Sequence, residues 1–481
     1  MVGLERDPPA GATLNTHDQT PRFSRRRMLQ GGLGLGVAAL GLGPVGTLLA
    51  KTGSGLGVSP GYGPLAPVRD RATGLPLLQL PAGFEYTSFG WAGEEIAPGQ
   101  ACPGKHDGMG VVGAEGDIVT LVRNHELTDE PGGSFAPASA TYNPDARGGT
   151  VTLRFDTARG EFVDATPSLS GTLVNCAGGV TPWGSWLSCE EIVLDAGQKV
   201  RVSKDYVHEM THSHGFVFEV PGKGLSSAEP LLAMGQMKHE AAAVDPRDGI
   251  VYLTEDHKPY AGFYRFIPRV AGELHRGGRL QMLRAEGAPD LRTGCRVGDI
   301  MKVRWVDIDE PTKGTDSDGG PGGLVRQGLA NGGTAFVRLE GVIVEQGRVY
   351  FISTSGGDAG CGQLWAYRPD EGLLELVFES PSPDVLDYPD NIVASPRGGL
   401  VICEDSEQPV QRLYGLDRAG GLFEFCRNNV VLDGHLGFSG DFREEEWAGA
   451  CFSPDGRWLF ANIYEPGFTV AITGPWRPGL I

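Results

Sequence analysis

Residues 175–191 read NCAGGVTPWGSWLSCEE, and they set a pattern that the rest of the chain repeats. Pro182 and the glycines disfavour a long helix, so the stretch predicts a strand, a tight turn and a second strand. Such a hairpin brings Cys176 close to Glu190 and Glu191. A thiol and carboxylates at one place indicate a metal site. The stretch alone also allows a buried core thiol beside a solvated strand end, because free cysteines are often buried.

The same unit recurs further along the chain. It is an apolar strand, a turn containing Pro or Gly, and a second apolar strand. In such turns proline restricts φ and glycine allows a positive φ, and both suit the turn of a hairpin. Hairpins repeated among other strands are typical of the blades of a β-propeller. Because their spacing is irregular, the pattern predicts an all-β fold, either a propeller or several sandwiches. The repeats are residues 241–256 (AAAVDPRDGIVYLTED), 391–405 (NIVASPRGGLVICED) and 448–463 (AGACFSPDGRWLFANI).

Other short strands are expected between these units, because little 3.6-residue periodicity appears from residue 67 onward. We expect the polar stretch at residues 311–333 to be a long surface loop or excursion rather than a domain linker. The expected strands lie at residues 117–122, 151–155, 215–220, 251–254, 262–267, 349–353, 363–367 and 400–403.

Composition excludes some classes of function. The chain has 481 residues, 40% of them hydrophobic, with 74 glycines, 34 prolines and a formal net charge of −19. That charge argues against a nucleic-acid partner, which would need a basic surface. Carboxylates can instead hold calcium, although most of them serve solubility. The eight cysteines form no CxxC pair, and one or two disulfides stay open. The histidines at 208, 212 and 214 fit a polar loop better than a zinc site.

Three of the predicted second strands end in acidic residues. These ends are residues 190–191, 255–256 and 404–405. If the hairpins are equivalent, the six carboxylates lie at one level of the fold and repel one another unless cations compensate them. The pattern therefore favours a site for several metal ions, with a splayed, solvated rim as the alternative.

The N-terminus resembles an export signal. Residues 24–30, SRRRMLQ, follow the twin-arginine pattern, with Met28 and Gln30 departing from it. The apolar run at residues 31–50 contains seven glycines and Pro44, which is typical of a signal region rather than a membrane anchor. We expect residues 1–50 to be the signal and residues 51–481 a single domain. The protein would be exported folded, by the twin-arginine machinery, to the periplasm or the medium.

Taken together, the motifs resemble those of the PhoX-type alkaline phosphatases, in order and over nearly the whole chain after the signal. The matching pieces are residues 106–109 (HDGM), 123–126 (RNHE), 176–191, 214–218 (HGFVF), 238–245 (KHEAAAVD), 336–341 (FVRLEG), 389–391 (PDN), 403–405 (CED) and 448–476.

This resemblance implies a six-bladed propeller that binds iron and calcium near its axis and hydrolyses phosphate monoesters outside the cytoplasm. It also implies a role for individual residues. Cys176 would be the thiolate ligand of iron, and Arg338 would hold the phosphoryl oxygens. The carboxylate ligands would be Glu240 and Glu340, joined by Glu191 or its neighbour Glu190, while Asn124, Glu126 and Glu404 would bind calcium or support the ligands.

The chemistry of the residues agrees with this assignment. A soft thiolate suits iron better than calcium, which prefers six to eight oxygen ligands. Arg338 stands two residues before Glu340, and on one strand at residues 336–340 both side chains would face the same pocket. The alternative is a salt bridge between them on a solvated face. Two rival functions stay open: a calcium-dependent propeller lactonase or esterase, and a propeller that binds a ligand without catalysis.

Overall fold

The computed structural model describes residues 59–128, 133–203, 206–317 and 319–481. The predicted signal at residues 1–50 lies outside them. Strands dominate the described part of the chain, as the sequence predicted. Its helices are α2 (Gly323–Ala330) and three short 3-10 turns, η2 (Ala138–Ala140), η3 (Leu232–Met234) and η4 (Leu274–Arg276).

The strands form five principal antiparallel sheets. The first contains β6 (His106–Glu115), β7 (Ile118–His125), β8 (Gly148–Asp156) and β9 (Glu161–Thr172). The second contains β10 (Asn175–Val180), β11 (Ser185–Glu190) and β14 (Val217–Pro221). The third has nine strands, β15 (His239–Val244), β16 (Val251–Glu255), β17 (Phe263–Pro268), β18 (Gly278–Ala285), β19 (Ile300–Asp307), β23 (Leu373–Glu379), β22 (Gln363–Arg368), β21 (Arg348–Ser353) and β20 (Leu339–Glu345).

The remaining two sheets combine both ends of the described chain. One runs β1 (Leu65–Val68), β2 (Leu78–Pro81), β27 (Leu422–Asn428), β26 (Arg412–Leu416), β25 (Leu400–Glu404) and β24 (Pro389–Ala394). The other runs β3 (Glu85–Phe89), β32 (Phe468–Thr473), β31 (Leu459–Ile463) and β30 (Trp447–Phe452). Separate two-stranded hairpins are β4 (Glu95–Ala97) with β5 (Gln100–Ala101), β12 (Lys199–Ser203) with β13 (Tyr206–Glu209), and β28 (Val431–His435) with β29 (Phe438–Asp441).

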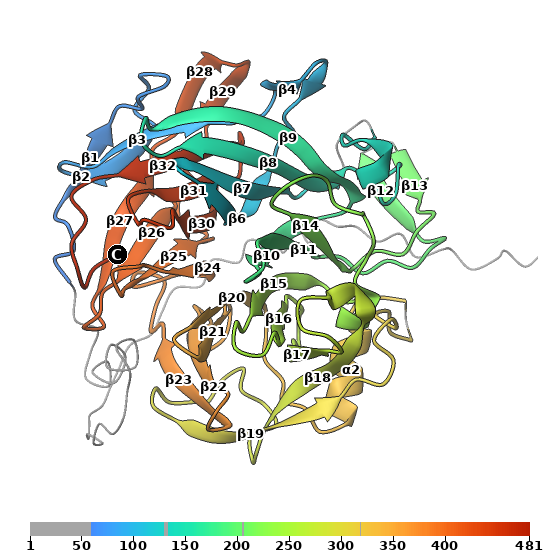
Figure 1. Cartoon of the computed structure of the whole chain (residues 1–481). Coiled ribbons are helices and arrows are strands. Elements are labelled where there is room, and N and C mark those ends of the chain that lie inside the picture. Colours follow the sequence, from blue (N-terminus) through green and yellow to red (C-terminus); the bar gives the residue numbers. More distant parts are fainter. Residues whose placement is uncertain (1–58, 129–132, 204–205, 318) are drawn as a thin grey trace, which may run out of the picture.

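The sheets are arranged around a common centre (Figure 1). Their inner strands contact one another in a closed ring, in the order β6, β10, β15, β20, β24, β30 and back to β6. The two ends of the described chain also meet in one sheet, because β3, near its start, pairs with β32, near its end. This radial arrangement of sheets is propeller-like.

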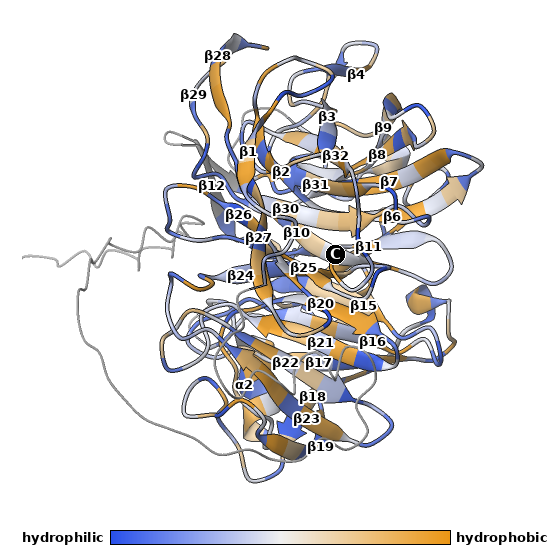
Figure 2. Cartoon of the chain, turned by 90° about the vertical axis from the view of Figure 1, so that its left-hand side faces the viewer, coloured by the Kyte–Doolittle hydropathy of each residue, from blue (hydrophilic) through white to orange (hydrophobic). Residues whose placement is uncertain are grey.

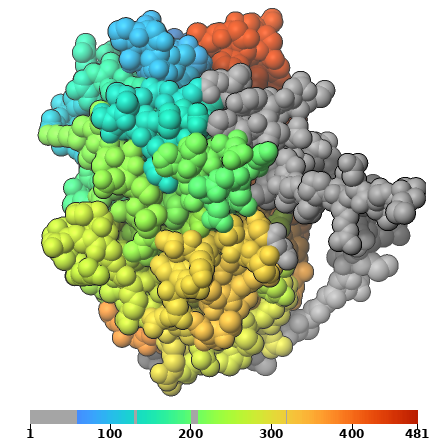
Figure 3. Space-filling model, turned by 90° about the vertical axis from the view of Figure 1, so that its right-hand side faces the viewer, coloured from blue at the N-terminus to red at the C-terminus, as the bar shows by residue number. Residues whose placement is uncertain are grey.

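The hydrophobic core lies between neighbouring sheets. Phe89, Phe155 and Phe460, for example, come from β3, β8 and β31 and share one buried cluster. Burying such a side chain contributes about 1.5–3 kcal/mol, so the stacked sheets hold one another in place. Figure 2 shows apolar residues concentrated in the strands and polar residues in the connections. On the side seen in Figure 3, the middle of the chain, in green and yellow, forms most of the surface.

The four predicted hairpins are confirmed as β10–β11, β15–β16, β24–β25 and β30–β31. The expectation of a surface loop or excursion at residues 311–333 was wrong in part, because residues 323–330 of this stretch form the helix α2. Leu324 and Val325 of that helix are buried in the same cluster as Met282 of β18. These apolar residues bury one face of the helix, which the glycine-rich composition of the stretch concealed.

All eight cysteines lie in the described part of the chain, and each is a free thiol. This settles the question of disulfides that the sequence left open. Among the described residues, we find no helix that combines the length and the apolar character needed to cross a membrane.

Candidate metal centre

Six hairpins with one shared local geometry build the site. Each pairs an inner strand with the next strand of its sheet, and the register shifts at a β-bulge close to the end of the pair. A bulge re-aims the side chain that it carries and is common beside functional sites. The pairs that precede the shift are His106↔His125, Asn175↔Glu190, His239↔Glu255, Leu339↔Ser353, Pro389↔Glu404 and Ala448↔Asn462.

The first residue of each bulge, which we call the bulge position, carries a potential metal ligand in five of the six hairpins. In the sixth, this residue is Gly449, where a Cβ would lie 2.6 Å from the carbonyl oxygen of Asp107. A side chain therefore cannot be accommodated there without moving the neighbouring strand. The five ligand-type residues are Asp107, Cys176, Glu240, Glu340 and Asp390.

Two further positions recur around the ring. The strand-end position follows the second strand of each hairpin, and the rim position precedes the inner strand. In every hairpin, the N–H of the strand-end residue donates to the carbonyl oxygen of the rim residue, at 2.8–3.2 Å. The strand-end residues are Glu126, Glu191, Asp256, Thr354, Asp405 and Tyr464, and their rim partners are Lys105, Val174, Lys238, Arg338, Tyr388 and Glu446.

The acidic residues at these three positions and the thiol of Cys176 meet in one cluster. Sγ of Cys176 donates a hydrogen bond to Oε2 of Glu240 at 2.8 Å. Within each of three groups, one ligand atom per residue lies within 4.8 Å of the others. The groups are Cys176 with Glu191 and Glu240, Glu240 with Glu340 and Asp390, and Asp107 with Glu126 and Glu446.

Burial and mutual repulsion dominate the electrostatics of the cluster. Burial, and then the charge of Glu191, raises the pKa of Glu126 to about 7. Burial, and then Asp405, raises the pKa of Asp390 to about 7. Burial raises the pKa of Glu240 well above its usual range, and the charge of Glu340 adds to the effect. So many buried like charges are stable together only when protons or cations neutralise them, and the donor set fits cations.

Arg338 lies at the edge of this cluster and is held by two carboxylates. Its Nε lies 3.1 Å from Oδ1 of Asp256, and its Nη2 lies 2.8 Å from Oε1 of Glu340. The backbone of Arg338 has a φ of +43°, which is unfavourable for a residue with a Cβ. Arg338 therefore precedes β20 rather than standing on a strand with Glu340, so that part of the prediction was wrong. The salt bridge is present, but it is largely buried.

Two of the predicted ligands have their polar atoms committed to the protein. Glu190 accepts hydrogen bonds from the backbone N–H groups of Leu173, Gly215 and Phe216 and from Nδ1 of His214. The amide of Asn124 donates to the carbonyl oxygens of residues 176 and 177, and its Oδ1 accepts from Trp186 and Ser188. Asn124 and Glu190 thus brace the hairpin that carries Cys176, and of the acidic pair at residues 190–191 it is Glu191 that faces the cluster.

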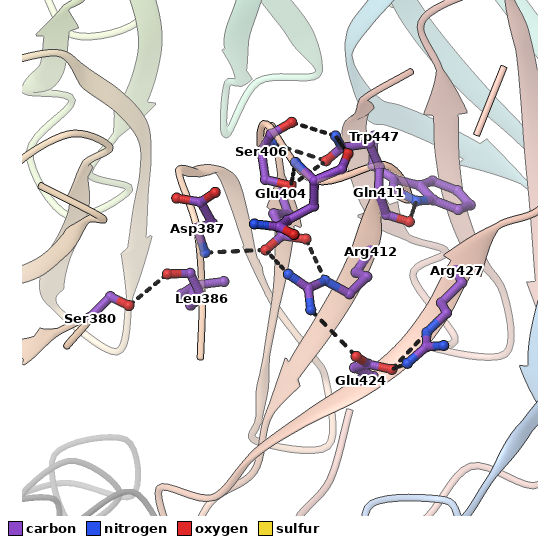
Figure 4. Close-up of polar contacts among 11 residues, drawn as sticks. Ser380, Leu386, Asp387, Glu404, Ser406, Gln411, Arg412, Glu424, Arg427 and Trp447 are labelled. Atoms are coloured by element: carbon purple, nitrogen blue, oxygen red, sulfur yellow. Dashed lines mark hydrogen bonds and ion pairs between the residues drawn. The ribbon is translucent and has the colours of Figure 1, made fainter. Parts of the chain in front are cut away.

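Glu404 has a similar structural role (Figure 4). Both of its oxygens lie 2.7 Å from the guanidinium of Arg412, and Oε1 also accepts from the N–H of Asp387 at 3.1 Å. Its neighbour Asp405 occupies the strand-end position. Glu255 and Asp256 divide in the same way, since Glu255 accepts from the hydroxyl of Tyr264 at 2.7 Å. The first acid of each pair is hydrogen-bonded or ion-paired to protein groups outside the cluster, and the second acid faces the cluster.

Of the predicted residues, the structure thus brings Cys176, Glu126, Glu191, Glu240 and Glu340 together, with Arg338 at the edge. Sequence reasoning assigned no role to several other members of the cluster. A usable signal was present for the bulge position, because in each of the five bulges that begin with an acid or thiol, that residue is followed by Gly, Ala or Asn. The members missed are Asp107, Asp390, Glu446 and the cation Lys238, whereas Asp256 and Asp405 were among the six strand-end carboxylates that the sequence placed together.

A fourth group, Cys102 with His106 and His125, also has ligand atoms within 4.8 Å of one another. The guanidinium of Arg123 donates to Sγ of Cys102 at 3.1 Å. His106 and His125 each bond a backbone carbonyl oxygen, of Pro103 and Gly104 respectively. Because a fixed cation touches the sulfur, this group is poorly suited to a metal ion.

Fold and site together define a propeller-like, all-β protein with a buried acidic cluster that contains one thiol and could hold metal ions. The family itself follows from a comparison of sequences. The family model of alkaline phosphatase PhoX matches residues 60–169 and 148–467 of this chain. The chain belongs to this family, whose members are phosphoric monoester hydrolases. The resemblance noted in the sequence is thereby confirmed.

No curated protein matches the chain. Among solved structures, a gluconolactonase from Xanthomonas campestris is 13% identical, with a TM-score of 0.41 over 87% of this chain and 99% of that one. The PQQ domain of pyranose dehydrogenase from Coprinopsis cinerea is 8% identical, with a TM-score of 0.31 over 84% of this chain and 98% of that one. At such TM-scores these likenesses have no bearing on fold or function.

Proposed function

We propose that this protein is an exported, metal-dependent alkaline phosphatase that hydrolyses phosphate monoesters at the cluster, with iron and calcium as its metals. The observation that carries the proposal is the placement of Arg338. Asp256 and Glu340 fix its guanidinium beside a buried cluster of carboxylates and one thiol. A planar guanidinium next to metal ligands is suited to a phosphoryl group.

The donor groups differ in the cations they suit. Cys176, Glu191 and Glu240 combine a soft sulfur with carboxylates, which favours iron. Asp107, Glu126 and Glu446 offer oxygen alone, which favours calcium. Glu340 and Asp390 complete the proposed ligands. We assign Asn124, Glu190 and Glu404 to the support of these ligands, because their polar atoms are occupied by protein partners.

When bound, the metal ions would act as Lewis acids on the phosphoryl group. The protein's own contribution is orientation. Two of the guanidinium nitrogens of Arg338 are committed to Asp256 and Glu340. The rest of the fork would donate to the phosphoryl oxygens as negative charge develops in the transition state. Because the guanidinium is already fixed, little ordering remains when substrate binds.

The proposal extends to the architecture and the location of the protein. Each inner strand of the closed ring would belong to one blade, which gives a six-bladed propeller with the cluster on its axis. Residues 51–481 would form this single domain. Residues 1–50 would be the signal that directs the folded protein, through the twin-arginine machinery, to the periplasm or the medium, without stable membrane insertion and without a nucleic-acid partner.

The test uses protein exported from its own signal. Elemental analysis would give iron and calcium per chain, and hydrolysis of p-nitrophenyl phosphate would be followed before and after chelation. We expect both metals, and activity that chelation removes and that Cys176→Ala and Arg338→Ala abolish. Arg247→Ala, at a surface arginine paired with Asp245 and Asp370, serves as the control. Calcium without iron and no phosphate release at any pH would instead favour the lactonase, the esterase or the binding propeller.

A further inference from the structure

A cavity lies outside the metal-ligand cluster, on the side of the ring where the inner strands begin. Its volume is about 500 Å³, a size typical of small-molecule sites. Its walls come from connections between strands of the principal sheets, including two of the separate hairpins. The lining residues that matter below are Ala101, Leu127, Phe135, Phe438, Phe442 and Glu465.

The two hairpins extend the connections that lead into neighbouring inner strands. The β4–β5 hairpin lies between β3 and β6, and its Ala101 lines the cavity. The β28–β29 hairpin lies between β27 and β30, and its Phe438 lines the cavity from another side. Figure 1 shows both hairpins on the same side of the ring. The cavity is therefore an addition to the ring of inner strands, built by segments that the ring itself does not require.

Three phenylalanines give the cavity its chemical character. Phe135, Phe438 and Phe442 are each half-buried, so part of each ring stays open to a ligand. The ring of Phe135 is edge-on to that of His125, with 5.9 Å between their centroids. The N–H of Phe442 donates to the carbonyl oxygen of Val430 at 2.9 Å. Aromatic rings held in this way favour an aromatic ligand, because ring pairs gain stabilisation beyond the area that they bury.

The cavity adjoins the cluster across the ring from Arg338. Leu127, which lines the cavity, directly follows the strand-end residue Glu126. Glu465 also lines it and directly follows the strand-end residue Tyr464, whose hydroxyl donates to Glu126. These residues belong to the hairpins of β6 and β30, whereas Arg338 precedes β20. In the ring of six inner strands, β6 and β20 are three places apart, so they lie opposite each other.

We propose that this cavity binds the alcohol portion of the phosphate monoester and selects esters of aromatic alcohols. The inference rests on the proposed function and extends it, because it names a class of substrate and places the selecting residues outside the cluster. With the phosphoryl group at the cluster and held by Arg338, the alcohol portion would reach across the ring. Its aromatic ring would then contact Phe438 and Phe442.

The test compares two esters whose alcohols are similarly basic, 2-phenylethyl phosphate and ethyl phosphate, on the metal-loaded, full-length protein. Selectivity is the ratio of their kcat/KM values, in which any effect common to both esters cancels. The variants are Phe438→Ala, Ala101→Trp and, as a matched control, Phe162→Ala. Ala101 is exposed, so a tryptophan there would fill the cavity without entering the core. Phe162 is 37% exposed and lies on β9, outside the cavity.

We expect the wild-type protein to prefer the phenylethyl ester about 10-fold, the factor that an aromatic contact in an apolar pocket supplies. Phe438→Ala and Ala101→Trp should abolish this preference, mainly through KM, and Phe162→Ala should keep it. Titration calorimetry with 2-phenylethylphosphonate and ethylphosphonate, whose P–C bonds resist hydrolysis, should show the same preference and the same losses without catalysis.

The inference would be overturned if the wild-type protein showed no preference, or if the variants kept the wild-type ratio. Ala101→Trp decides the matter alone if Phe438→Ala does not fold. Hydrolysis of ethyl phosphate without a preference would overturn this inference and leave the proposed function standing. Hydrolysis of neither ester by the metal-loaded wild-type protein would overturn the proposed function, and this inference with it.

Discussion

Cys176 and Glu240 come from neighbouring inner strands, and Sγ of Cys176 lies 2.8 Å from Oε2 of Glu240. Each occupies the bulge position of its own hairpin, β10–β11 and β15–β16. A soft and a hard ligand are thereby held next to each other by equivalent backbone geometry.

Cys176→Ser should remove iron and spare calcium. Serine keeps a small side chain that can donate a hydrogen bond, but it lacks the soft sulfur that selects a transition metal. We expect iron per chain to fall at least 10-fold, as measured by elemental analysis. Cys189→Ser is the matched control, since Cys189 is a buried core thiol of the same hairpin. Equal iron contents in the two variants would contradict a ligand role for Cys176.

Arg338→Lys should behave almost like Arg338→Ala. A lysine ammonium keeps the charge, but it cannot contact Asp256, Glu340 and a phosphoryl oxygen in the planar arrangement of a guanidinium. We expect kcat/KM for p-nitrophenyl phosphate to fall about 100-fold or more in both variants. Arg247→Lys, at the surface, should keep the wild-type value. If Arg338→Lys retains half of the activity, the residue acts as a point charge and the orientation of its fork is unimportant.

Glu404→Gln and Asp405→Asn should affect different properties, the first the stability of the protein and the second its metal content. Glu404 is fully buried and pairs with Arg412, so its replacement should lower the free energy of unfolding by roughly 3 kcal/mol and leave the metal content unchanged. Asp405→Asn should lower the metal content with a smaller effect on the stability of the metal-free protein. Chemical denaturation after chelation and elemental analysis before it would distinguish them. The reverse outcome would show that the wrong member of the pair was assigned to the cluster.

The chelated protein should lose stability as pH rises from about 4 to about 7, that is, from the ordinary pKa of the cluster carboxyls to their raised pKa in the fold. In the unfolded chain these carboxyls ionise near pH 4, whereas the folded chain holds their protons to higher pH, with a pKa of about 7 for Glu126 and Asp390. The folded state then binds more protons, so the stability present at low pH is lost as pH passes through the folded pKa values. Within this window, below the ordinary pKa of histidine, His106, His125 and His239 oppose the trend, because burial lowers their pKa and protonation then favours the unfolded chain.

Thermal unfolding of chelated and cation-loaded protein over this pH range would check the prediction. We expect the Tm of the chelated protein to fall by roughly 5–10 °C, and the cation-loaded protein to show little change. A Tm of the chelated protein that rises with pH would mean that the carboxyls are already ionised in the fold without cations.

The sequence by itself determined the repeating hairpins, because the placement of Pro and Gly between apolar runs is a local property of the chain. It also determined that the second strands of three hairpins end in a pair of acidic residues, at residues 190–191, 255–256 and 404–405. Cys176 belongs to the hairpin that ends in the first of these pairs. These features predicted the all-β fold and a site with several carboxylates. The family motifs added Glu240, Glu340 and Arg338 to the same site.

Only the tertiary structure decided which residue of each acidic pair faces the cluster. Neighbouring side chains on a strand point to opposite faces, so the alternation is readable in the sequence but the face is not. The face depends on the bulge in each hairpin and on distant partners such as His214 for Glu190 and Arg412 for Glu404. Closure of the ring then placed Lys238 beside Arg338, which are 100 residues apart in the chain.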